Sequence, residues 1–272
     1  MNYLIVDTSY YNFYRFYATK QWYVRAYPDD KFEDDYNWSI NEVFWNKFKK
    51  MFLTNLDKMT KKFKIDKVIF ARDCPRNNIW RMPFYSNYKG DRDKNYKKNN
   101  FQGGAVFKKC YSEIINTLVD NKQFYQIKID KLEADDIIAL SCSEILKKSL
   151  NSTIYVVSSD HDLLQIITPQ INLIDAKMKS YNDKSYGSKK KNIFMKCVIG
   201  DVSDSIPKVF NKTGPKTALK LYDNPCDLLE KFLKNPGSID KFTLNYLLVS
   251  FDNIPTYLKD NFIKIYNDLN IN

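Results

Sequence analysis

The sequence predicts an α/β fold with a central, mostly parallel sheet flanked by helices, followed by a helical C-terminal part. Short apolar runs recur before residue 172, and amphipathic segments of helical spacing lie between them. Acidic residues directly follow several of these runs, where parallel strands would end. After residue 172 the strand-like runs give way to helical segments.

The first part of the chain alternates strands with helices. Strands are expected at residues 3–6, 67–71, 124–129 and 154–157, and helices at residues 39–63, 107–118 and 133–146. This alternation is typical of a parallel sheet with helices on both faces. Residues 10–38 and 76–104 show no clear period, and we expect long loops or partly helical excursions there.

The last part of the chain is expected to be helical. The segments with helical spacing are residues 190–198, 215–222, 225–233, 239–250 and 255–269. We therefore divide the chain into an α/β core at residues 1–175 and a helical subdomain at residues 176–272.

The composition favours a polyanionic partner. There are 43 Lys and Arg residues against 32 Asp and Glu, which gives a formal net charge of +11. The five cysteines are scattered and never form a C-x-x-C pair, as expected for free thiols in a reducing compartment. The chain shows no signal peptide and no long apolar run, so we expect an intracellular, soluble protein without membrane contact, and a monomer by default.

Several kinds of site lack their residues. With 7 glycines the chain has neither a G-x-G-x-x-G nor a P-loop pattern, which argues against a nucleotide-binding protein on a Rossmann-like sheet. A single histidine, His161, and no cysteine pair leave a tetrahedral zinc site without ligands. Any metal would be held by oxygen, and we expect His161 to serve packing or to lie outside the direct ligands.

Carboxylates are placed where a site could form. The acidic residues after strands, at a helix start and in a late turn are Asp7, Asp73, Glu133, Asp135, Asp136, Asp160, Asp162, Asp201 and Asp204. Each alone could be a helix cap, a helix-start charge or a turn residue. Gathered at one sheet edge, they would repel by roughly 4 kcal/mol per close pair at an effective dielectric constant near 20. Such a cluster needs cations. Oxygen ligands select Mg²⁺ or Mn²⁺, and a pair of such ions is suited to in-line attack on a phosphodiester.

Four motifs together resemble the flap endonuclease and 5′-to-3′ exonuclease superfamily, nearest to its phage-type RNase H branch. They are EADD at 133–136, SSDHDLLQ at 158–165, GDVSDSIP at 200–207 and TGPKTALKLY at 213–222. The resemblance covers most of the chain. It implies a PIN-like 5′-nuclease core, an arch or gateway loop at about residues 76–104, and a helix-turn-helix-type duplex-binding element at about residues 195–222.

The resemblance also implies roles for the acidic residues and for two basic ones. The residues around a first Mg²⁺ would be Asp7, Asp73, Glu133, Asp135 and Asp160. Those around a second would be Asp162, Asp201 and Asp204, with Asp136 at the boundary, and Mn²⁺ could substitute for Mg²⁺. Lys89 and Arg92, in YKGDR, would face the scissile phosphate as catalytic residues.

DNA contacts are expected in two regions. In the arch they are Arg81, Lys97, Lys98 and Tyr88, with the Tyr88 ring stacked on a base. In the helix-turn-helix element they are Lys208, Lys212, Gly214, Lys216 and Thr217. That loop is one residue longer than the family pattern and keeps only its last glycine. The sequence therefore leaves undecided whether the backbone of this loop binds phosphate and whether the loop holds a K⁺ ion.

The sequence thus predicts a Mg²⁺-dependent, structure-specific 5′-nuclease that leaves 5′-phosphates. Its substrates would be DNA with a 5′ flap or overhang and RNA–DNA hybrids, in viral or phage DNA replication and repair, with replication proteins as further partners. The alternatives are a PIN-like ribonuclease and a junction-binding scaffold with weak or no cleavage. The TGPKTALKLY and GDVSD segments argue against the first, and the complete set of carboxylates argues against the second.

Overall fold

A five-stranded parallel sheet forms the centre of the protein. The computed structural model describes residues 1–90 and 101–271. The strands are β1 (Asn2–Asp7), β2 (Lys67–Arg72), β3 (Phe124–Lys128), β4 (Thr153–Val157) and β5 (Ile171–Ile174), in the spatial order β3-β2-β1-β4-β5. Every pairing in the sheet is parallel, which confirms the predicted fold class. The sequence analysis did not single out β5, whose four residues are INLI.

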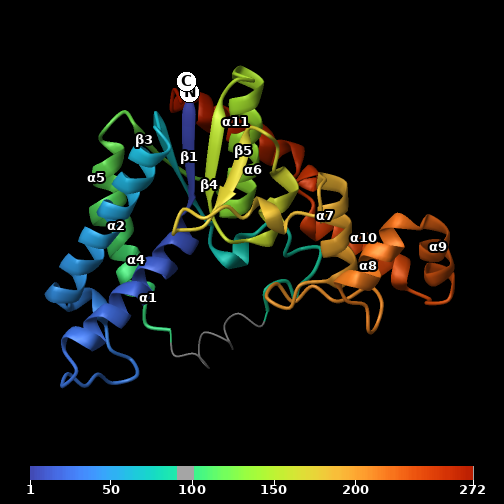
Figure 1. The fold of residues 1–272 in the computed structure, drawn as a ribbon, viewed down its shortest axis with the longest axis horizontal. Helices are drawn as coiled ribbons and strands as arrows, with labels where there is room; N and C mark the ends of the chain where they lie inside the picture. Colours follow the sequence, from blue (N-terminus) through green and yellow to red (C-terminus); the bar gives the residue numbers. More distant parts are fainter. Residues whose placement is uncertain (91–100, 272) are drawn as a thin grey trace.

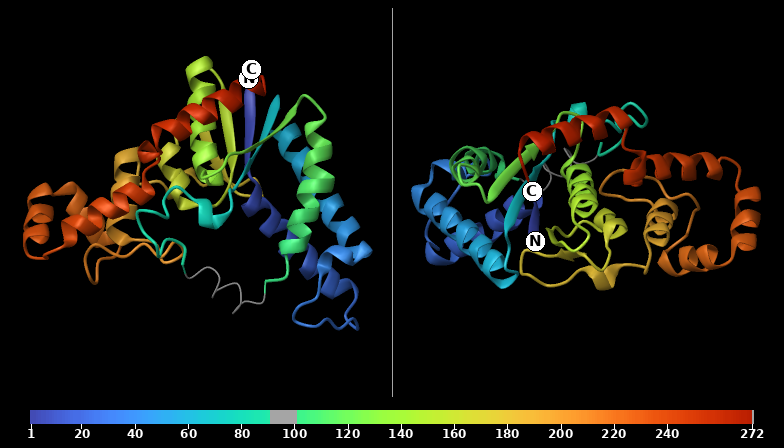
Figure 2. Two further views of the ribbon diagram at one scale, coloured as in Figure 1. Left: turned by 180° about the vertical axis from the view of Figure 1, so that it is seen from behind. Right: turned by 90° about the horizontal axis from the view of Figure 1, so that it is seen from above.

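Helices cover both faces of the sheet (Figures 1 and 2). Successive residues of a strand point to opposite faces. Leu4 and Val6 of β1 accordingly join one apolar cluster with α1 (Thr8–Ala26), α2 (Glu42–Lys62) and α4 (Gly104–Cys110). Tyr3 and Ile5 join another with α6 (Ala134–Lys148) and α11 (Thr256–Asp268). The remaining short elements are η1 (Trp38–Ile40), η2 (Arg76–Asn78), η3 (Tyr111–Ile115), α5 (Asn116–Val119), η4 (His161–Ile166), η5 (Asn182–Lys184) and η6 (Phe251–Asn253).

Helix α1 covers the first part of residues 10–38, where we expected a long loop or a partly helical excursion. It is 19 residues long, and its N-cap Asp7 accepts a hydrogen bond from the Tyr10 backbone N–H at 3.0 Å. Aromatic rings lie on several sides of this helix, so no single apolar stripe marks it in the sequence. The buried rings of Tyr11, Phe16 and Tyr23 pack in the cluster shared with α2.

A group of helices extends to one side of the sheet (Figure 1). These are α7 (Lys189–Ile199), α8 (Pro215–Asp223), α9 (Pro225–Leu233) and α10 (Ser238–Val249). Residues of α7, α8 and the loop between them bury a small core of their own, against which Phe232 of α9 packs. Helix α11 instead returns to α6 and contributes Phe262 and Tyr266 to the core under the sheet. The last segment of the expected helical subdomain is therefore part of the α/β layer.

The sheet order places a topological switch point between β1 and β4. From β1 the chain adds β2 and β3 on one side and β4 and β5 on the other. Ligand sites of open parallel sheets lie outside the carboxyl ends of the strands at such a point. Asp7 ends β1, and residues 158–160 follow β4 at the same edge. No helix within residues 1–90 and 101–271 is long and apolar enough to cross a membrane.

Candidate metal and nucleic-acid site

Four carboxylates lie at the carboxyl edge of the sheet, and we call them the strand-end group: Asp7, Asp73, Asp135 and Asp160. Asp7 is buried, and its side chain also accepts a hydrogen bond from Ser158 Oγ at 2.9 Å. Asp73 accepts from Ser9 Oγ at 2.6 Å and from the Ala134 backbone N–H at 2.9 Å. The end of β2 is thereby joined to the start of α6.

The strand-end carboxylates repel one another. Burial, followed by the charge of Asp73, raises the pKa of Asp7 to about 7. Burial, followed by the charges of Asp160 and Asp7, raises the pKa of Asp135 well above its ordinary value. Within the described part of the chain, no lysine or arginine forms an ion pair with any of the four. The group is therefore not paired with a described basic side chain, although Lys196 borders the same cavity as Asp7 and Asp160.

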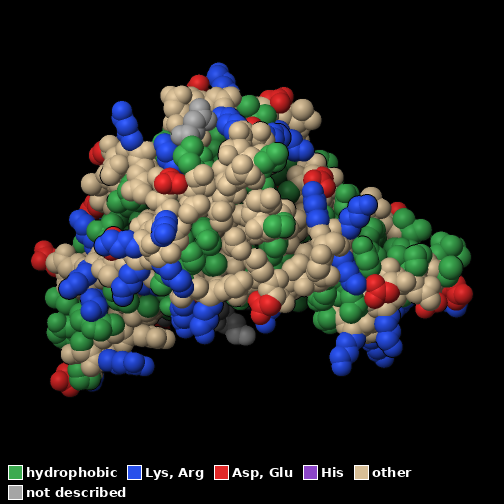
Figure 3. Space-filling model, turned by 45° about the horizontal axis from the view of Figure 1, so that its top comes forward, with side chains coloured by type: hydrophobic (Ala, Val, Ile, Leu, Met, Phe, Trp, Pro, Cys, Tyr) green, Lys and Arg blue, Asp and Glu red, His purple; other side chains and the backbone are tan. Residues whose placement is uncertain are grey.

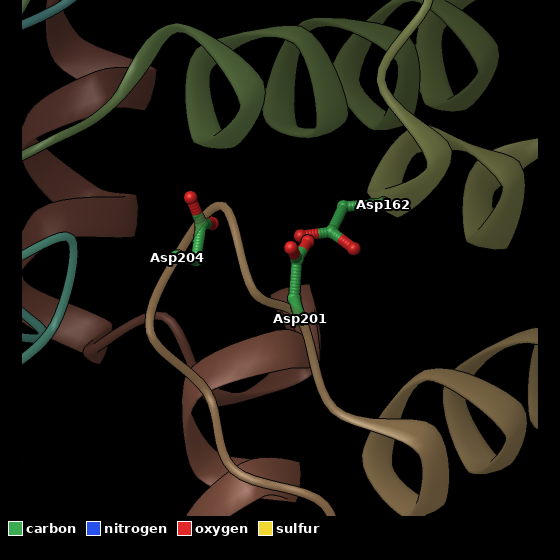
Figure 4. Close-up of side chains that lie close together, drawn as sticks. All are labelled: Asp162, Asp201 and Asp204. Atoms are coloured by element: carbon green, nitrogen blue, oxygen red, sulfur yellow. The ribbon is translucent and has the colours of Figure 1, made fainter. Parts of the chain in front are cut away.

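Asp162, Asp201 and Asp204 form a second group. One carboxylate oxygen from each lies within 4.8 Å of the others (Figure 4). Asp162 comes from η4, directly after β4, and the other two come from the loop after α7. Figure 4 shows the carboxylates of Asp162 and Asp201 facing each other. The fold thus brings together three acids that are up to 42 residues apart in the sequence.

A lysine accompanies this second group, which we therefore call the Lys196 group. Lys196 Nζ lies 2.7 Å from Asp162 Oδ1 and also pairs with Asp201. Burial raises the pKa of Asp162 to about 7 although Lys196 opposes this. Burial also raises the pKa of Asp201, but Lys196 and Ser203 outweigh it and lower that pKa to about 2.

The sequence did not single out Lys196. It lies in α7, five residues before Asp201, and its side chain is only 17% exposed. The available signal was a lone lysine within the apolar stretch IFMKCVI. A lysine is rarely buried without a partner, so that position predicted an acidic neighbour.

Arg81 binds two of the expected metal ligands. It is 3% exposed and donates to Glu133 Oε2 at 2.9 Å, to Asp136 Oδ1 at 2.7 Å and to the Leu248 carbonyl at 2.7 Å. Tyr88 Oη donates to Glu133 at 3.0 Å, and Lys89 forms an ion pair with the same carboxylate. Burial raises the pKa of Glu133, but Lys89 and Arg81 outweigh it and lower the pKa to about 2.

These contacts correct three of the sequence-based expectations. Arg81 and Tyr88, expected to contact DNA, are 3% and 4% exposed and hold Glu133 in place. Asp136, expected near a metal, is fully buried and accepts from Arg81, from Trp80 Nε1 and from the Glu133 backbone N–H. The physical reason is that buried carboxylates require hydrogen-bonded cations, so this arginine faces the interior.

Lys89 links this buried cluster to the Lys196 group. Its side chain is 8% exposed, and Nζ lies 3.8 Å from Asp204 Oδ2. Its backbone N–H donates to the Asp204 carbonyl at 2.9 Å, which ties the base of the expected arch to the loop after α7. The other arch residues expected to act on substrate, Arg92, Lys97 and Lys98, lie outside the described residues.

A cavity of about 360 Å³ opens between the strand-end group and the Lys196 group. It is lined by Asp7, Tyr10, Ser158, Ser159, Asp160, His161, Lys196, Asp201 and Ser203. His161 is exposed at its rim rather than packed in the core, with its ring 6.0 Å from that of Tyr181. The cavity therefore presents carboxylates, hydroxyl groups and one ammonium group.

The loop between α7 and α8 and the first turn of α8 carry the residues expected to bind the duplex. Lys208, Lys212, Lys216 and Thr217 are exposed, and Gly214 is the N-cap of α8. No described side chain caps this helix, so the backbone N–H groups of its first turn, after Pro215 which has none, are available to an anion.

An ammonium group lies against the same loop. Lys231 Nζ, from α9, donates to the Oγ1 of buried Thr213 at 3.3 Å and lies 5.0 Å from the Phe210 ring centroid.

Comparison with known proteins agrees with this geometry. Residues 2–193 match the model of the 5′-3′ exonuclease N-terminal resolvase-like domain. Ribonuclease H of Enterobacteria phage T4 is 24% identical over 216 residues, which cover 74% of this chain and 70% of that protein. A 5′-3′ exonuclease of Buchnera aphidicola from Acyrthosiphon pisum is 30% identical over 213 residues, 76% of this chain and 68% of that protein. The fold is shared with the D15 flap endonuclease of phage T5, solved as a complex with DNA and metal ions, at 17% identity and a TM-score of 0.70 over 99% of both chains.

Proposed function

Since the chain belongs to the 5′-3′ exonuclease family, we propose that the cavity between the strand-end group and the Lys196 group is its active site and holds two divalent cations. The protein is a structure-specific 5′-nuclease, a hydrolase of phosphodiester bonds. The observation that carries the proposal is that the strand-end carboxylates repel one another and that none of them forms an ion pair with a described lysine or arginine.

The donor set fits divalent metal ions. Carboxylate oxygens are the ligands that Mg²⁺ and Mn²⁺ prefer, and the chain offers them in two adjoining groups. A cation near Asp7 and Asp135 would relieve the repulsion that raises their pKa values. We propose Mg²⁺ as the physiological ion, with Mn²⁺ as a substitute.

The residues have separate roles in this proposal. Asp7, Asp73, Asp135 and Asp160 would hold one cation, and Asp162, Asp201 and Asp204 the other. Bound cations would supply an activated water and stabilise negative charge during phosphodiester hydrolysis. Glu133 and Asp136, expected as ligands, would instead position Lys89 and Arg81. Lys89 and Arg92 remain our candidates for the groups that face the scissile phosphate.

The proposed substrates are DNA with a 5′ flap or overhang and RNA–DNA hybrids. The relatives named ribonuclease H and flap endonuclease support both kinds, and a DNA complex of the T5 protein supports a DNA substrate. The exposed lysines of the α7–α8 loop and the uncapped start of α8 would hold duplex phosphates. We propose a monomer that acts with replication proteins in the cytoplasm of a bacterial host cell.

The residues of the α7–α8 loop do not suit a K⁺ site well. The Lys231 ammonium group already donates to Thr213 in the loop where the family resemblance implies this ion. We propose that Lys231 supplies this positive charge, so that duplex binding does not require K⁺.

Cleavage of a 5′-labelled flap duplex, with Mg²⁺ or with EDTA, tests the proposal. We expect metal-dependent release near the junction that falls by at least about a hundredfold in Asp160→Asn. Asp120→Asn is the matched control, since Asp120 is exposed at the opposite edge of the sheet, away from the acidic cavity. Intact junction binding without cleavage by the wild type would favour the scaffold alternative, and cleavage of single-stranded RNA alone would favour a PIN-like ribonuclease.

A further inference from the structure

A second cavity, separate from the acidic one, lies between α1 and α2. It has a volume of about 270 Å³ and is lined by Arg15, Lys47, Lys50, Met51, Thr54, Asn55 and Lys58. Its walls carry four basic side chains and no carboxylate. Lys and Arg side chains gather at the left of Figure 3, the side on which α1 and α2 lie. We call this cavity the Arg15 pocket.

Arg15 is a buried charge that forms no ion pair with any residue the structure describes. The residue is 6% exposed, and its Nε is buried with no hydrogen-bond partner in the described part of the chain. The guanidinium carbon lies 4.3 Å from the ring centroid of Tyr14 and 5.4 Å from that of Tyr11. An arginine stays protonated in proteins, and contact with aromatic faces offsets only part of the free energy that a charge loses when it leaves water.

The surrounding residues leave this positive charge uncompensated. Asp57, next to Lys58 in the sequence, pairs with Lys61 at 2.8 Å instead. Lys47 lies over the Trp22 ring, with Nζ 4.3 Å from the centroid. Asn55 accepts a hydrogen bond from Tyr11 Oη at 2.9 Å, so its amide N–H groups are the ones left to donate. The pocket therefore collects donors and positive charge in one place.

We propose that the Arg15 pocket binds a phosphate group. A planar guanidinium with nearby ammonium groups matches the oxygens of a phosphate better than it matches a neutral ligand. The expected source is a phosphodiester of the substrate strand, an assignment that rests on the proposed function. Arg15 follows Asp7 by eight residues on α1, which is roughly 12 Å along the helix axis at about 1.5 Å per residue. A strand held at the acidic cavity can therefore reach the pocket with a phosphate a few nucleotides away.

The test measures binding to the full chain without cleavage, in EDTA. Fluorescence anisotropy with a 5′-flap duplex compares the Lys50→Gln/Lys58→Gln variant with a Lys49→Gln/Lys62→Gln control of equal charge. Lys49 and Lys62 are exposed residues of the same helix that do not line the pocket. We expect the pocket variant to bind roughly tenfold more weakly than the control. The slope of log K against log[salt] should become shallower by about 0.9 for each phosphate that the variant no longer neutralises.

A second arm identifies the source of the phosphate. Calorimetry with inorganic phosphate compares the wild type, Arg15→Gln and the lysine variants, with thermal melts to check that Arg15→Gln is folded. Loss of phosphate binding with duplex affinity equal to the control would support a site for a free phosphate compound. The proposal is overturned if the pocket variants bind both the duplex and inorganic phosphate as tightly as their controls do. If Arg15→Gln unfolds, the variant with the exposed Lys50 and Lys58 replaced still gives this result. Cleavage assays decide the proposed function separately, because neither arm depends on Mg²⁺.

Discussion

The strand-end group and the Lys196 group are both clusters of buried and half-buried carboxylates, but they differ in their counter-ions. Lys196 pairs with Asp162 and Asp201, whereas no described lysine or arginine pairs with Asp7 or Asp135. Lys196 helps lower the pKa of Asp201 to about 2, whereas the pKa values of Asp7 and of Asp162 are raised to about 7. The protein itself supplies a cation to the Lys196 group, and we expect the strand-end group to depend more strongly on an external cation.

We expect this difference in counter-ions to affect folding stability and cleavage activity in different ways. Residues that lack a counter-ion should weaken the metal-free fold and support cleavage, since their charge is compensated only by a ligand. Residues that form ion pairs within the protein should contribute both to folding stability and to cleavage activity. The following variants test that distinction.

Asp7→Asn should have the largest effect, and in opposite directions on activity and stability. We expect flap cleavage in Mg²⁺ to fall by at least about a hundredfold, because a cation ligand is removed. The metal-free protein should melt several degrees higher at pH 8, since about 1 kcal/mol shifts Tm by roughly 2–4 °C at this chain length. Single-turnover cleavage and calorimetric melts in EDTA measure the two effects. A lower Tm would contradict the repulsion inferred for this group.

Lys196→Met should destabilise the metal-free protein strongly. Removal of one partner from a buried ion pair costs about 3–5 kcal/mol, because the remaining charges are left uncompensated. Mg²⁺ should restore part of the loss, which urea unfolding with and without Mg²⁺ would detect. Lys189→Met is the control, since Lys189 pairs with Asp252 at the surface, where such a pair contributes about 0–1 kcal/mol. Equal losses in the two variants would refute a special role for Lys196.

The stabilisation by Mg²⁺ should grow with pH. Asp7 and Asp162 have folded pKa values of about 7, above their unfolded values, so the folded state retains protons and metal-free stability falls as pH rises from about 4 to 7. Glu133 and Asp201, with pKa values lowered to about 2, stabilise above about pH 4 and lose that effect only in more acidic solution. The Mg²⁺-induced rise in Tm should therefore be larger at pH 8 than at pH 5.5. A constant shift over this range would mean that these carboxylates are already ionised without metal.

Replacement of K⁺ by Na⁺ should have the smallest effect. Because Lys231 donates to Thr213 in the α7–α8 loop, duplex affinity at equal ionic strength should change by less than about twofold, well under 1 kcal/mol. Lys231→Met should weaken binding in Na⁺ more than in K⁺. Lys234→Met is the control, as Lys234 pairs with Glu230 on the surface of the same helix. A strong K⁺ dependence of the wild type would show that Lys231 does not supply this charge.

The sequence by itself determined the α/β class, four of the strands, the helices of the C-terminal part and the family. Strand and helix periods are local properties, and an acid after an apolar run lies at a sheet edge wherever the strands pair in parallel. It did not determine the extent of α1, whose aromatic residues hide its period, and it did not single out β5.

Only the tertiary structure decided which charges are compensated. Arg81 reaches Glu133 across 52 residues, and Lys196 meets Asp162 across 34. In the sequence alone, the position of Arg81 is equally consistent with an exposed contact to DNA, which is what we expected for it. Burial and counter-ions depend on how separate elements pack, and no pattern within one element records that. Among the described residues, the packing of α1 on α2 likewise leaves Arg15 without an ion-pair partner, and the packing of the sheet edge leaves Asp7 without one.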